Sequence, residues 1–411
     1  MIDIQLIREN PDLVKKNNES RSVDVDVDAI LKLDGERREL QAKFDTKRGG
    51  QKKMSKGKPE GDDLKKLKKL KKEVKDLEKK ISSLAAELKS ILIQLPNVNL
   101  PGVVVGGEEA NKVEREVGKK PKLENPKPHE KLGARLGWFD LERGAKVSGN
   151  RFWYLKGQAV MLQMALQDFV MRKLVQKGFT PMVVPNLVRE DTLYGAGFLP
   201  AQEFEIYSVN PGEDNLFLIG TAEAPLVAYF KDETIDVKKP KRLCAFSPAY
   251  RREAGAYGKD TTGIFRGHQF DKLEMVSFTT QEDSEKEHQF LLTIEEEIIS
   301  ELGLPYQLVS LASGDMSPQA AQCYDIEVWL PGQNKYRELT SCSNTTDYQS
   351  RRLNIKHKTK DGLKLVHTLN GTGVAIGRTL IAILENHQDE NGDIHVPKPL
   401  QAYMGVTVLK P

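Results

Sequence analysis

Cysteine is scarce in this chain of 411 residues, which contains only Cys244, Cys323 and Cys342. The three form no CxxC pair and the sequence has no HExxH motif, which argues against a structural zinc site or a disulfide framework and for a reducing compartment. No apolar run reaches the roughly 18 residues that a membrane-spanning helix needs. The first ten residues already carry charges and match neither a secretory signal nor a transit peptide. We therefore expect a soluble, cytoplasmic protein with no membrane partner.

The chain also lacks a large excess of positive or negative charge. The chain has 62 lysines and arginines against 59 acidic residues, a formal net charge of only +3. Net charge therefore says little about partners, and any basic surface has to be local. The length leaves room for two domains and a sizeable core.

The N-terminal part carries a strong helical pattern. Residues 1–22 predict a short helix, with Pro11 as a break or as the first-turn residue of a second helix. Apolar residues recur at heptad-like spacing over 30–44 and, in alternating steps of three and four, over 67–95. A polar, glycine-containing stretch at 49–61 separates the two patterns. Together they predict an antiparallel coiled-coil hairpin roughly 40 Å long.

This hairpin is basic. Between Glu36 and Lys89 there are 19 lysines and arginines against 10 acidic residues. A solvated coiled-coil surface explains such a run for an isolated hairpin. Beside a nucleotide site, the same lysines can follow a phosphate backbone without reading bases, which gives shape-based and salt-sensitive RNA binding.

The remaining chain predicts a mixed domain. Residues 97–150 are rich in glycine, proline and lysine and are expected to form an irregular linker. Residues 158–176 and 284–302 are expected to be amphipathic helices, and 179–184 a short strand that ends at Pro185.

Our interpretation of this domain depends mainly on residues 246–276. An extended approach reaches Arg251, Arg252 and Glu253, and a loop with Gly255, Gly258 and Gly263 leads to a returning strand. The return has side chains at a spacing of two, which we expect on one face of a sheet: Arg266, His268, Phe270, Lys272 and Glu274. A cation, an aromatic plane and a carboxylate in a row suit a phosphate, a purine and an amine. A β-hairpin with a solvated, charged face is the plainer alternative.

Three further segments fit a substrate site less specifically when each is taken alone. Thr221-Ala222-Glu223 follows a strand at 216–219 and by itself is a helix start with an acidic first turn. Residues 325–341 predict a hairpin across Pro331-Gly332, and 368–385 a strand-to-helix turn with Arg378. The glycines near Arg378 could be mistaken for a dinucleotide fingerprint, but Ile376 stands at its sixth position and no βαβ unit surrounds it.

Taken together, these motifs resemble those of the class II aminoacyl-tRNA synthetases, and the details around Arg251–Gly255 and His268–Phe270 resemble the seryl-tRNA synthetase family, in its zinc-free bacterial-like form. The resemblance covers essentially the whole chain. It implies an α+β architecture, with an N-terminal coiled-coil hairpin and a C-terminal domain built on a mostly antiparallel sheet flanked by helices. It places the tRNA-binding arm at 1–105 and the catalytic domain at 106–411.

The resemblance also implies the chemistry: ATP-dependent activation of L-serine to seryl-adenylate, then transfer to the 3′ end of tRNASer and, in the family, tRNASec. It implies Arg251, Arg266 and Arg378 as catalytic residues that clamp phosphates. The full set implied for ATP binding is Arg251, Arg252, Glu253, Arg266, Phe270, Glu338, Leu339, Thr340, Ser341 and Arg378. Phe270 would stack on adenine, and Glu338 and Ser341 would hold Mg²⁺, which prefers oxygen ligands.

Serine binding is implied for a second set: Thr221, Ala222, Glu223, Arg251, Glu274, Asn370 and Thr372. The helix at 158–176 with the following strand resembles the motif that forms a homodimer interface in the family. The sequence departs from the family pattern at Thr262, where arginine is common, and at Gly267, where a larger apolar residue is usual. No DNA partner is expected.

Two other classes remain open. One is a synthetase-like paralogue that activates an amino acid but loads a carrier protein. The long basic arm argues against it, because a small carrier protein has no phosphate backbone for the arm to bind. The other is a non-catalytic RNA-binding relative, which would be expected to have damaged phosphate clamps, whereas Arg251, Arg266 and Arg378 are all present.

Overall fold

The computed structural model of the protein describes residues 1–57, 60–254 and 263–411. Its contacts divide the chain into two units, Met1–Val98 and Asn99–Pro411. The sequence placed the division after residue 105. Residues 99–105 belong with the second unit because the amide of Leu100 donates to the carbonyl of Ala321 and the amide of Ser313 to that of Val104. In the described ranges, no helix is long and apolar enough to cross a membrane.

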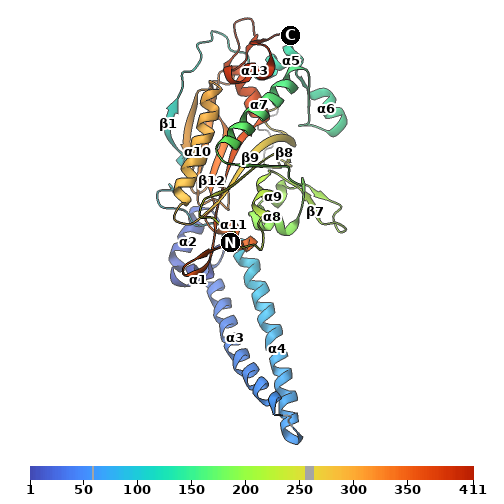
Figure 1. Ribbon diagram of the computed structural model, residues 1–411, viewed down its shortest axis with the longest axis vertical. Helices are drawn as coiled ribbons and strands as arrows, with labels where there is room; N and C mark the ends of the chain where they lie inside the picture. Colours follow the sequence, from blue (N-terminus) through green and yellow to red (C-terminus); the bar gives the residue numbers. More distant parts are fainter. Residues whose placement is uncertain (58–59, 255–262) are drawn as a thin grey trace. The chain divides into compact units, whose positions relative to one another are not determined.

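Over its described residues, the first unit is helical (Figure 1), with α1 (Ile4–Glu9), α2 (Pro11–Ser20), α3 (Val27–Lys56) and α4 (Gly61–Leu92). Pro11 is the first residue of α2, as predicted. Asp26 caps α3 by accepting hydrogen bonds from the amides of Asp28 and Ala29. The predicted seam packs α4 on α3, with Leu67, Val74 and Leu88 buried.

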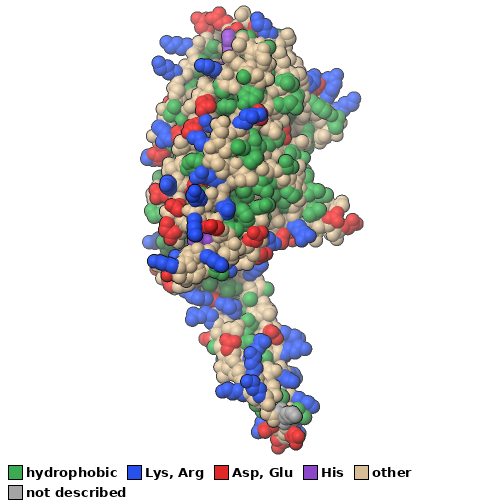
Figure 2. Space-filling view, in the orientation of Figure 1, with side chains coloured by type: hydrophobic (Ala, Val, Ile, Leu, Met, Phe, Trp, Pro, Cys, Tyr) green, Lys and Arg blue, Asp and Glu red, His purple; other side chains and the backbone are tan. Residues whose placement is uncertain are grey.

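The polar stretch at 49–61 does not form a turn throughout. Helix α3 continues through Gly49 and Gly50 to Lys56, although each glycine costs about 1 kcal/mol relative to alanine in a helix. Gly50 packs beside Leu70 of α4, so contact with the second helix supports the first one there. The lysines of α4 face outward, and Figure 2 shows them along the arm. Lys47 and Glu73 join α3 to α4 by an ion pair of 2.5 Å.

In the part of the chain that the structure describes, the second unit is built on a sheet of eight strands. In spatial order its strands are β1 (Lys112–Val117), β10 (Tyr306–Ser310), β11 (Gln322–Leu330), β12 (Lys335–Asn344), β15 (His367–Ala375), β9 (Gln269–Thr279), β8 (Lys241–Tyr250) and β4 (Thr180–Met182). The β4–β8 pair is parallel, and every other neighbouring pair in this sheet is antiparallel. The predicted α+β class with a mostly antiparallel sheet is confirmed. The linker predicted at 97–150 is wrong in part, because β1 forms the edge of this sheet.

Three long helices provide much of the core on one face of the sheet, namely α7 (Gln158–Gln176), α10 (Ser284–Glu301) and α12 (Ile376–Asn386). Ion pairs from Lys173 and Lys177 to Glu297 hold α7 beside α10 (Figure 1). Leu273 and Met275 of β9 point into this core. Because side chains alternate along a strand, Lys272 and Glu274 point to the opposite face.

Shorter elements complete the unit. The helices are α5 (His129–Leu136), α6 (Leu141–Ser148), α8 (Glu190–Ala196), α9 (Glu223–Ala228), α11 (Tyr348–Leu353) and α13 (Gln401–Met404), with 3-10 turns at Glu108–Ala110, Glu203–Glu205 and Lys398–Leu400. The small sheets are β5 (Leu187–Arg189) with β7 (Leu216–Leu218) and β6 (Ser208–Val209), β13 (Lys356–Thr359) with β14 (Gly362–Leu365), β2 (Phe139–Asp140) with β3 (Tyr154–Leu155), and β16 (Ile394–His395) with β17 (Val408–Leu409). Helix α9 packs on β8 and β9, on the face away from α7.

Candidate active site

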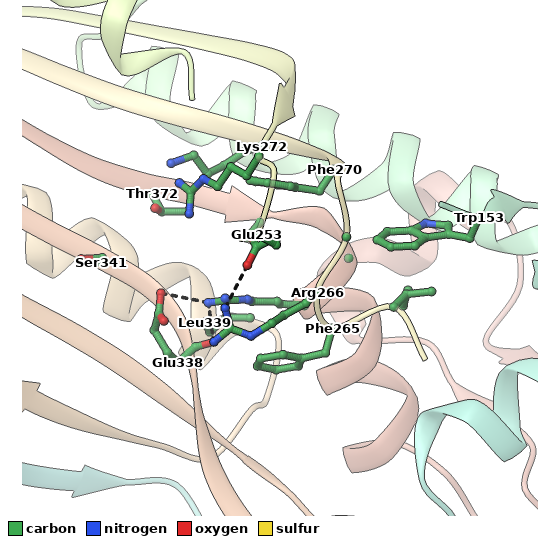
Figure 3. A pocket seen from close by; sticks show the side chains of 16 residues that line it. Trp153, Glu253, Phe265, Arg266, Phe270, Lys272, Glu338, Leu339, Ser341 and Thr372 are labelled. Atoms are coloured by element: carbon green, nitrogen blue, oxygen red, sulfur yellow. Dashed lines mark hydrogen bonds and ion pairs between the residues drawn. The ribbon is translucent and has the colours of Figure 1, made fainter. Parts of the chain in front are cut away.

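A cleft opens on the sheet face that carries Lys272. Three adjoining hollows form it, and all three are lined by Arg251, Arg266, Glu338 and Ser341. Arg378 lines two of them. Figure 3 shows Arg266 and Glu338 near one another, with Lys272, Phe270 and Thr372 on an adjacent wall. Three guanidinium groups that are distant in the sequence therefore converge on one cleft.

A bulge places the two predicted metal ligands on the same side of their strand. Glu338 pairs with Glu327 and Ser341 with Asp325, and the register shifts between these pairs. Without the shift, Glu338 and Ser341, three residues apart, would point to opposite faces. Thr340 pairs with Ile326 and is 3% exposed on the other face, and the structure does not bring it to the cleft.

Each arginine already has an acceptor in the protein. Arg266 forms an ion pair of 3.1 Å with Glu253 and Arg378 one of 2.9 Å with Glu338. Arg251 donates from Nε to the carbonyl of Gly220 at 3.3 Å, and its guanidinium lies 5.3 Å from the centre of the Phe270 ring. These contacts hold the guanidinium groups in place beside the cleft, and a guanidinium carries five N–H donors in a planar fork that suits an oxyanion.

Glu253 is held in an unusual backbone conformation. Its φ is +49°, a region that costs a non-glycine residue free energy. Its amide donates to Oε2 of Glu205 at 2.7 Å, and the amide of Arg252 donates to the carbonyl of Glu205 at 2.9 Å. Glu205, which sequence reasoning did not identify, therefore fixes the end of the motif next to Arg266. The side chain of Arg252 is exposed and does not line the cleft.

Two carboxyl groups of the cleft wall have displaced pKa values. Burial raises the pKa of Asp325 well above its usual range, and the charge of Glu338 raises it further. Burial acts to raise the pKa of Glu338, but the hydrogen bond from Arg378 and the charges of Arg378, Arg251 and Arg266 together hold that pKa below its usual range. Glu338 is therefore ionised beside Ser341.

The donor set at this point fits Mg²⁺. A carboxylate and a hydroxyl supply oxygen ligands, and Mg²⁺ commonly takes one or two protein ligands with substrate phosphates and waters. Among the described residues, no group of three or more His, Cys, Asp or Glu side chains is arranged to hold a metal ion. Glu338 and Ser341 would thus need a phosphate-bearing ligand to complete the coordination.

A second part of the cleft is buried and carries carboxylates. Thr221 donates from Oγ1 to Oε2 of Glu274 at 2.8 Å, and Asn370 lies with Nδ2 3.4 Å from the other oxygen. Glu274 is fully buried and paired with Lys272. Glu223 is 4% exposed, and burial, followed by the charge of Glu274, raises its pKa to about 7.

The structure brings most, but not all, of the predicted serine-site residues to the cleft. Thr221, Glu223, Arg251, Asn370 and Thr372 line one hollow. Glu274 is not among the residues that line this hollow, but it accepts a hydrogen bond from Thr221. The side chain of Ala222 instead packs in an apolar cluster with Leu226 and Val276.

Other residues of the motif differ from the expected strand. Arg266 and His268 precede β9, which starts at Gln269, so only Phe270, Lys272 and Glu274 alternate along it. Arg266 still lines the cleft. Leu339 also lines it. Gly255, Gly258 and Thr262 lie outside the described residues.

Sequence reasoning missed Trp153 and Phe265, which line the cleft. A Cβ atom at Gly267 would lie 2.1 Å from the Trp153 ring, which explains why a larger residue is absent at this position. The guanidinium carbons of Arg337 and Arg378 lie 3.8 and 4.8 Å from the centre of the Phe265 ring. Lys272 belongs to the alternating pattern of the sequence, but its pairing with Glu274 required the structure.

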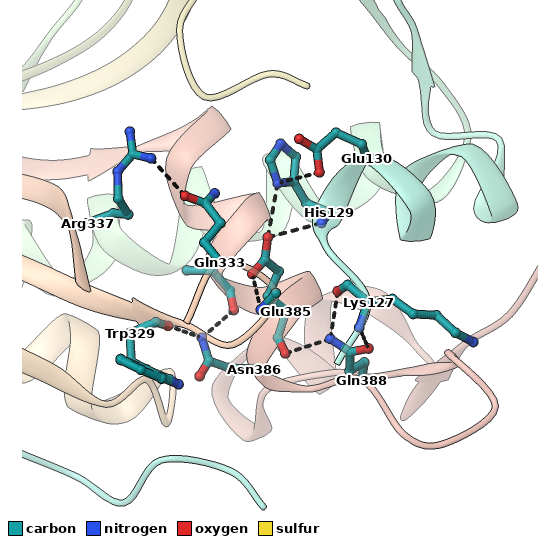
Figure 4. Close-up of polar contacts among 11 residues, drawn as sticks. Lys127, His129, Glu130, Trp329, Gln333, Arg337, Glu385, Asn386 and Gln388 are labelled. Carbon is teal, nitrogen blue, oxygen red and sulfur yellow. Dashed lines mark hydrogen bonds and ion pairs between the residues drawn. The ribbon is translucent and has the colours of Figure 1, made fainter. Parts of the chain in front are cut away.

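A buried polar cluster supports the elements around the cleft (Figure 4). Glu385, in the last turn of α12, accepts from the amides of His129 at 3.0 Å and Gly332 at 2.9 Å, and its Oε1 lies 3.0 Å from Nδ1 of the His129 ring. A Cβ at Gly263, where φ is +72°, would lie 2.1 Å from Nε2 of that ring. Glu385 thus joins the helix of Arg378 to the turn before β12, and His129 packs against the end of the glycine loop.

Comparisons with known proteins agree with this geometry. Residues 204–387 match the model of the tRNA synthetase class II core domain (G, H, P, S and T), and residues 1–99 match the seryl-tRNA synthetase N-terminal domain. The serine–tRNA ligase of Streptomyces coelicolor is 43% identical over 98% of both chains, and that of Dictyoglomus thermophilum is 44% identical over all of both. The structure of seryl-tRNA synthetase from Pyrococcus horikoshii, complexed with ATP, has a TM-score of 0.94 at 38% identity and covers both chains completely.

The antiparallel sheet, the arginine-lined cleft and the matching core model define a class II aminoacyl-tRNA synthetase. Full-length identity and the N-terminal match narrow this class, and the chain belongs to the seryl-tRNA synthetase family.

Proposed function

We propose that this protein activates L-serine with ATP and transfers the seryl group to the 3′ end of tRNASer. The observation that carries the proposal is the convergence of Arg251, Arg266 and Arg378 beside a hollow lined by Thr221, whose hydroxyl donates to the buried carboxylate of Glu274. The first region suits a folded triphosphate, and the second suits a small ligand with an ammonium and a hydroxyl group.

The first step joins two anions, so positioning and charge neutralisation supply most of the catalysis. A carboxylate oxygen of serine forms a bond to the α-phosphorus of ATP, the bond to the bridging oxygen breaks, and pyrophosphate leaves. Arg251, which borders both regions, would span the α-phosphate and the serine carboxylate. Arg266 and Arg378 would hold the β- and γ-phosphates, since a guanidinium binds oxyanions bidentately and stays charged.

The base and the metal ion have candidate partners in the same cleft. Phe270 would stack on adenine, and Glu253 would interact near the base or with a metal ion. Glu338 and Ser341 would hold Mg²⁺, which when bound neutralises phosphate charge. The ion pairs of Glu253 with Arg266 and of Glu338 with Arg378 would then rearrange.

Serine would be selected by the pocket of Thr221, Glu223, Glu274, Asn370 and Thr372. Alanine would leave the buried acceptors unpaired, which a site of this kind penalises strongly. Threonine would be excluded by size. The buried carboxylates of Glu223 and Glu274 favour a ligand that brings a positive charge, such as the serine ammonium group.

The helical arm, predicted at 1–105, would bind the tRNA backbone through its exposed lysines. tRNASec remains a predicted second substrate, and the cytoplasm the predicted location. A homodimer is supported by apolar side chains that α7 and the segment after β4 leave exposed: Met161, Met164, Val175 and Val183.

The test is ATP–pyrophosphate exchange with each amino acid, followed by charging of tRNASer and tRNASec. Exchange with serine alone and subsequent charging are expected. Activation without charging would favour the carrier-loading alternative, and no activation with any amino acid would favour a binding module.

A further inference from the structure

Gln349 of α11 contacts the serine pocket from outside the set of residues that the motifs identify. Its side-chain amide is 1% exposed. Nε2 donates to Oε1 of Glu223 at 2.7 Å and to the carbonyl of Ala196 at 2.9 Å. Oε1 lies 3.1 Å from Oγ1 of Thr345. One buried side chain therefore ties Glu223 to two other segments of the chain.

The chemistry of the partners determines the orientation of this amide. A carboxylate and a backbone carbonyl only accept, so both N–H bonds of Gln349 have to point at them. A flipped amide would place its oxygen against two acceptors in a buried site, which is costly. Both donors are thus committed, and Glu223 Oε1 has a fixed position.

Glu223 needs such support because of what surrounds it. It is the first residue of α9, its amide lies 3.3 Å from Oγ1 of Thr221, and its side chain lines the serine hollow. The charged groups that act on Glu223 are Glu274 and Lys272 of β9 and Arg251, which directly follows β8. Glu274 repels its negative charge, whereas the Gln349 donor stabilises it.

We propose that Gln349 is a positioning residue for serine binding, which orients the Glu223 carboxylate toward the substrate and favours its ionised form. This inference rests on the proposed function, because it assigns Glu223 to the serine pocket. The hydrogen bond of Gln349 lowers the pKa of Glu223 against the effects of burial and Glu274, in agreement with this role.

Gln349→Met tests the inference by removing the donors while keeping a similar volume. We expect the KM for serine in pyrophosphate exchange to rise about tenfold, with the KM for ATP within about twofold of the parent. Loss of the donor raises the Glu223 pKa, so the acidic limb of kcat/KM for serine should move to higher pH. Gln349→Glu keeps the shape but adds a third acid, so it should also raise the serine KM and move the acidic limb to higher pH. This variant replaces Gln349→Met in the test if Gln349→Met does not fold.

Two comparisons separate positioning from general support. Ser350→Ala alters the next residue of α11, where a buried hydroxyl donates to the carbonyl of Val366, and it should leave the serine KM and its pH profile unchanged. In a Glu223→Gln background, Gln349→Met should cause no further pH shift.

Parallel rises in the KM values for serine and ATP, or an unmoved pH profile in folded Gln349→Met, would overturn the positioning role while the proposed function stands. A parent protein without serine-dependent exchange would instead overturn the proposed function, and this inference with it.

Discussion

The two regions of the cleft handle charge in opposite ways. In the phosphate region, the side chains of Arg266 and Arg378 are 29% and 21% exposed and each is paired with a carboxylate. In the serine region, Glu223 and Glu274 are almost completely buried. The first region consists of cations with acceptors that a ligand can replace, whereas the second holds anions that solvent cannot screen.

This difference matches the two ligands that we propose. A triphosphate arrives with a high negative charge and its own waters, so a partly open set of arginines can exchange partners as it binds. Serine is small and zwitterionic, so its recognition depends on a few buried groups with defined positions. Loss of a phosphate clamp should therefore impair catalysis broadly, and loss of a pocket carboxylate should act on serine alone.

Arg378→Ala is expected to have the largest effect. Removing a clamp that neutralises the triphosphate should lower kcat/KM for ATP in pyrophosphate exchange by about 10²- to 10³-fold. The melting temperature should change little, because Glu338 is left partly exposed. Arg115→Ala serves as the control, because Arg115 lies on the distant edge strand β1 and pairs there with Glu296 of α10. An equal loss of kcat/KM in both variants would contradict the role of Arg378 as a phosphate clamp.

Glu274→Gln should act on the serine region. The amide keeps the shape and an acceptor for Thr221, but it loses the negative charge that pairs with Lys272 and that, in the proposed function, attracts the serine ammonium group. We expect kcat/KM for serine to fall about 100-fold, with a much smaller change for ATP. Steady-state exchange at varied serine and varied ATP measures both. A uniform loss for the two substrates would mean that Glu274 supports the cleft rather than binding serine.

Changes to the lysines of the helical arm should affect only the transfer of the seryl group to tRNA. Reversing the exposed Lys68, Lys72 and Lys79 of α4 to glutamate should lower tRNA charging about tenfold or more at low salt and leave pyrophosphate exchange unchanged. The dependence of charging on salt should become weaker, because fewer counterions are displaced. Reversal of the exposed Lys238, Lys239 and Lys241 in the other unit is a control for total charge. Equal losses would argue against the arm as the RNA-binding surface.

The smallest expected effect is a pH dependence of serine binding. The pKa of Glu223 is raised to about 7, so kcat/KM for serine should be about halved at pH 7 and about tenfold lower at pH 6 than at high pH. Glu223→Gln should remove this limb. The same raised pKa should make the free energy of unfolding fall as pH rises from about 4.5 to about 7, since the unfolded chain ionises first. A serine profile flat through pH 7 would contradict the ionised role.

Part of this site could be predicted from residues alone. The spacing of Arg266, Phe270 and Glu274 indicated a sheet face suited to a phosphate, a purine and an amine, and the resemblance to the family added Arg251 and Arg378 as phosphate clamps. Sequence patterns did not indicate that Thr340 faces the core, because a bulge in β12 breaks the alternation. They also did not indicate Glu205, whose carboxylate holds the amide of Glu253.

Local pattern determined the elements that depend on near neighbours. Helix α7 begins and ends where its apolar periodicity predicted, and the seam of α4 follows its heptads. Tertiary structure alone decided the continuation of α3 through Gly50, the place of β1 at the sheet edge, and the contact of Gln349 with Glu223. The physical reason is range: periodicity reports which face of an element is buried, but a hydrogen bond between residues 126 positions apart exists only once the whole sheet has brought their helices together.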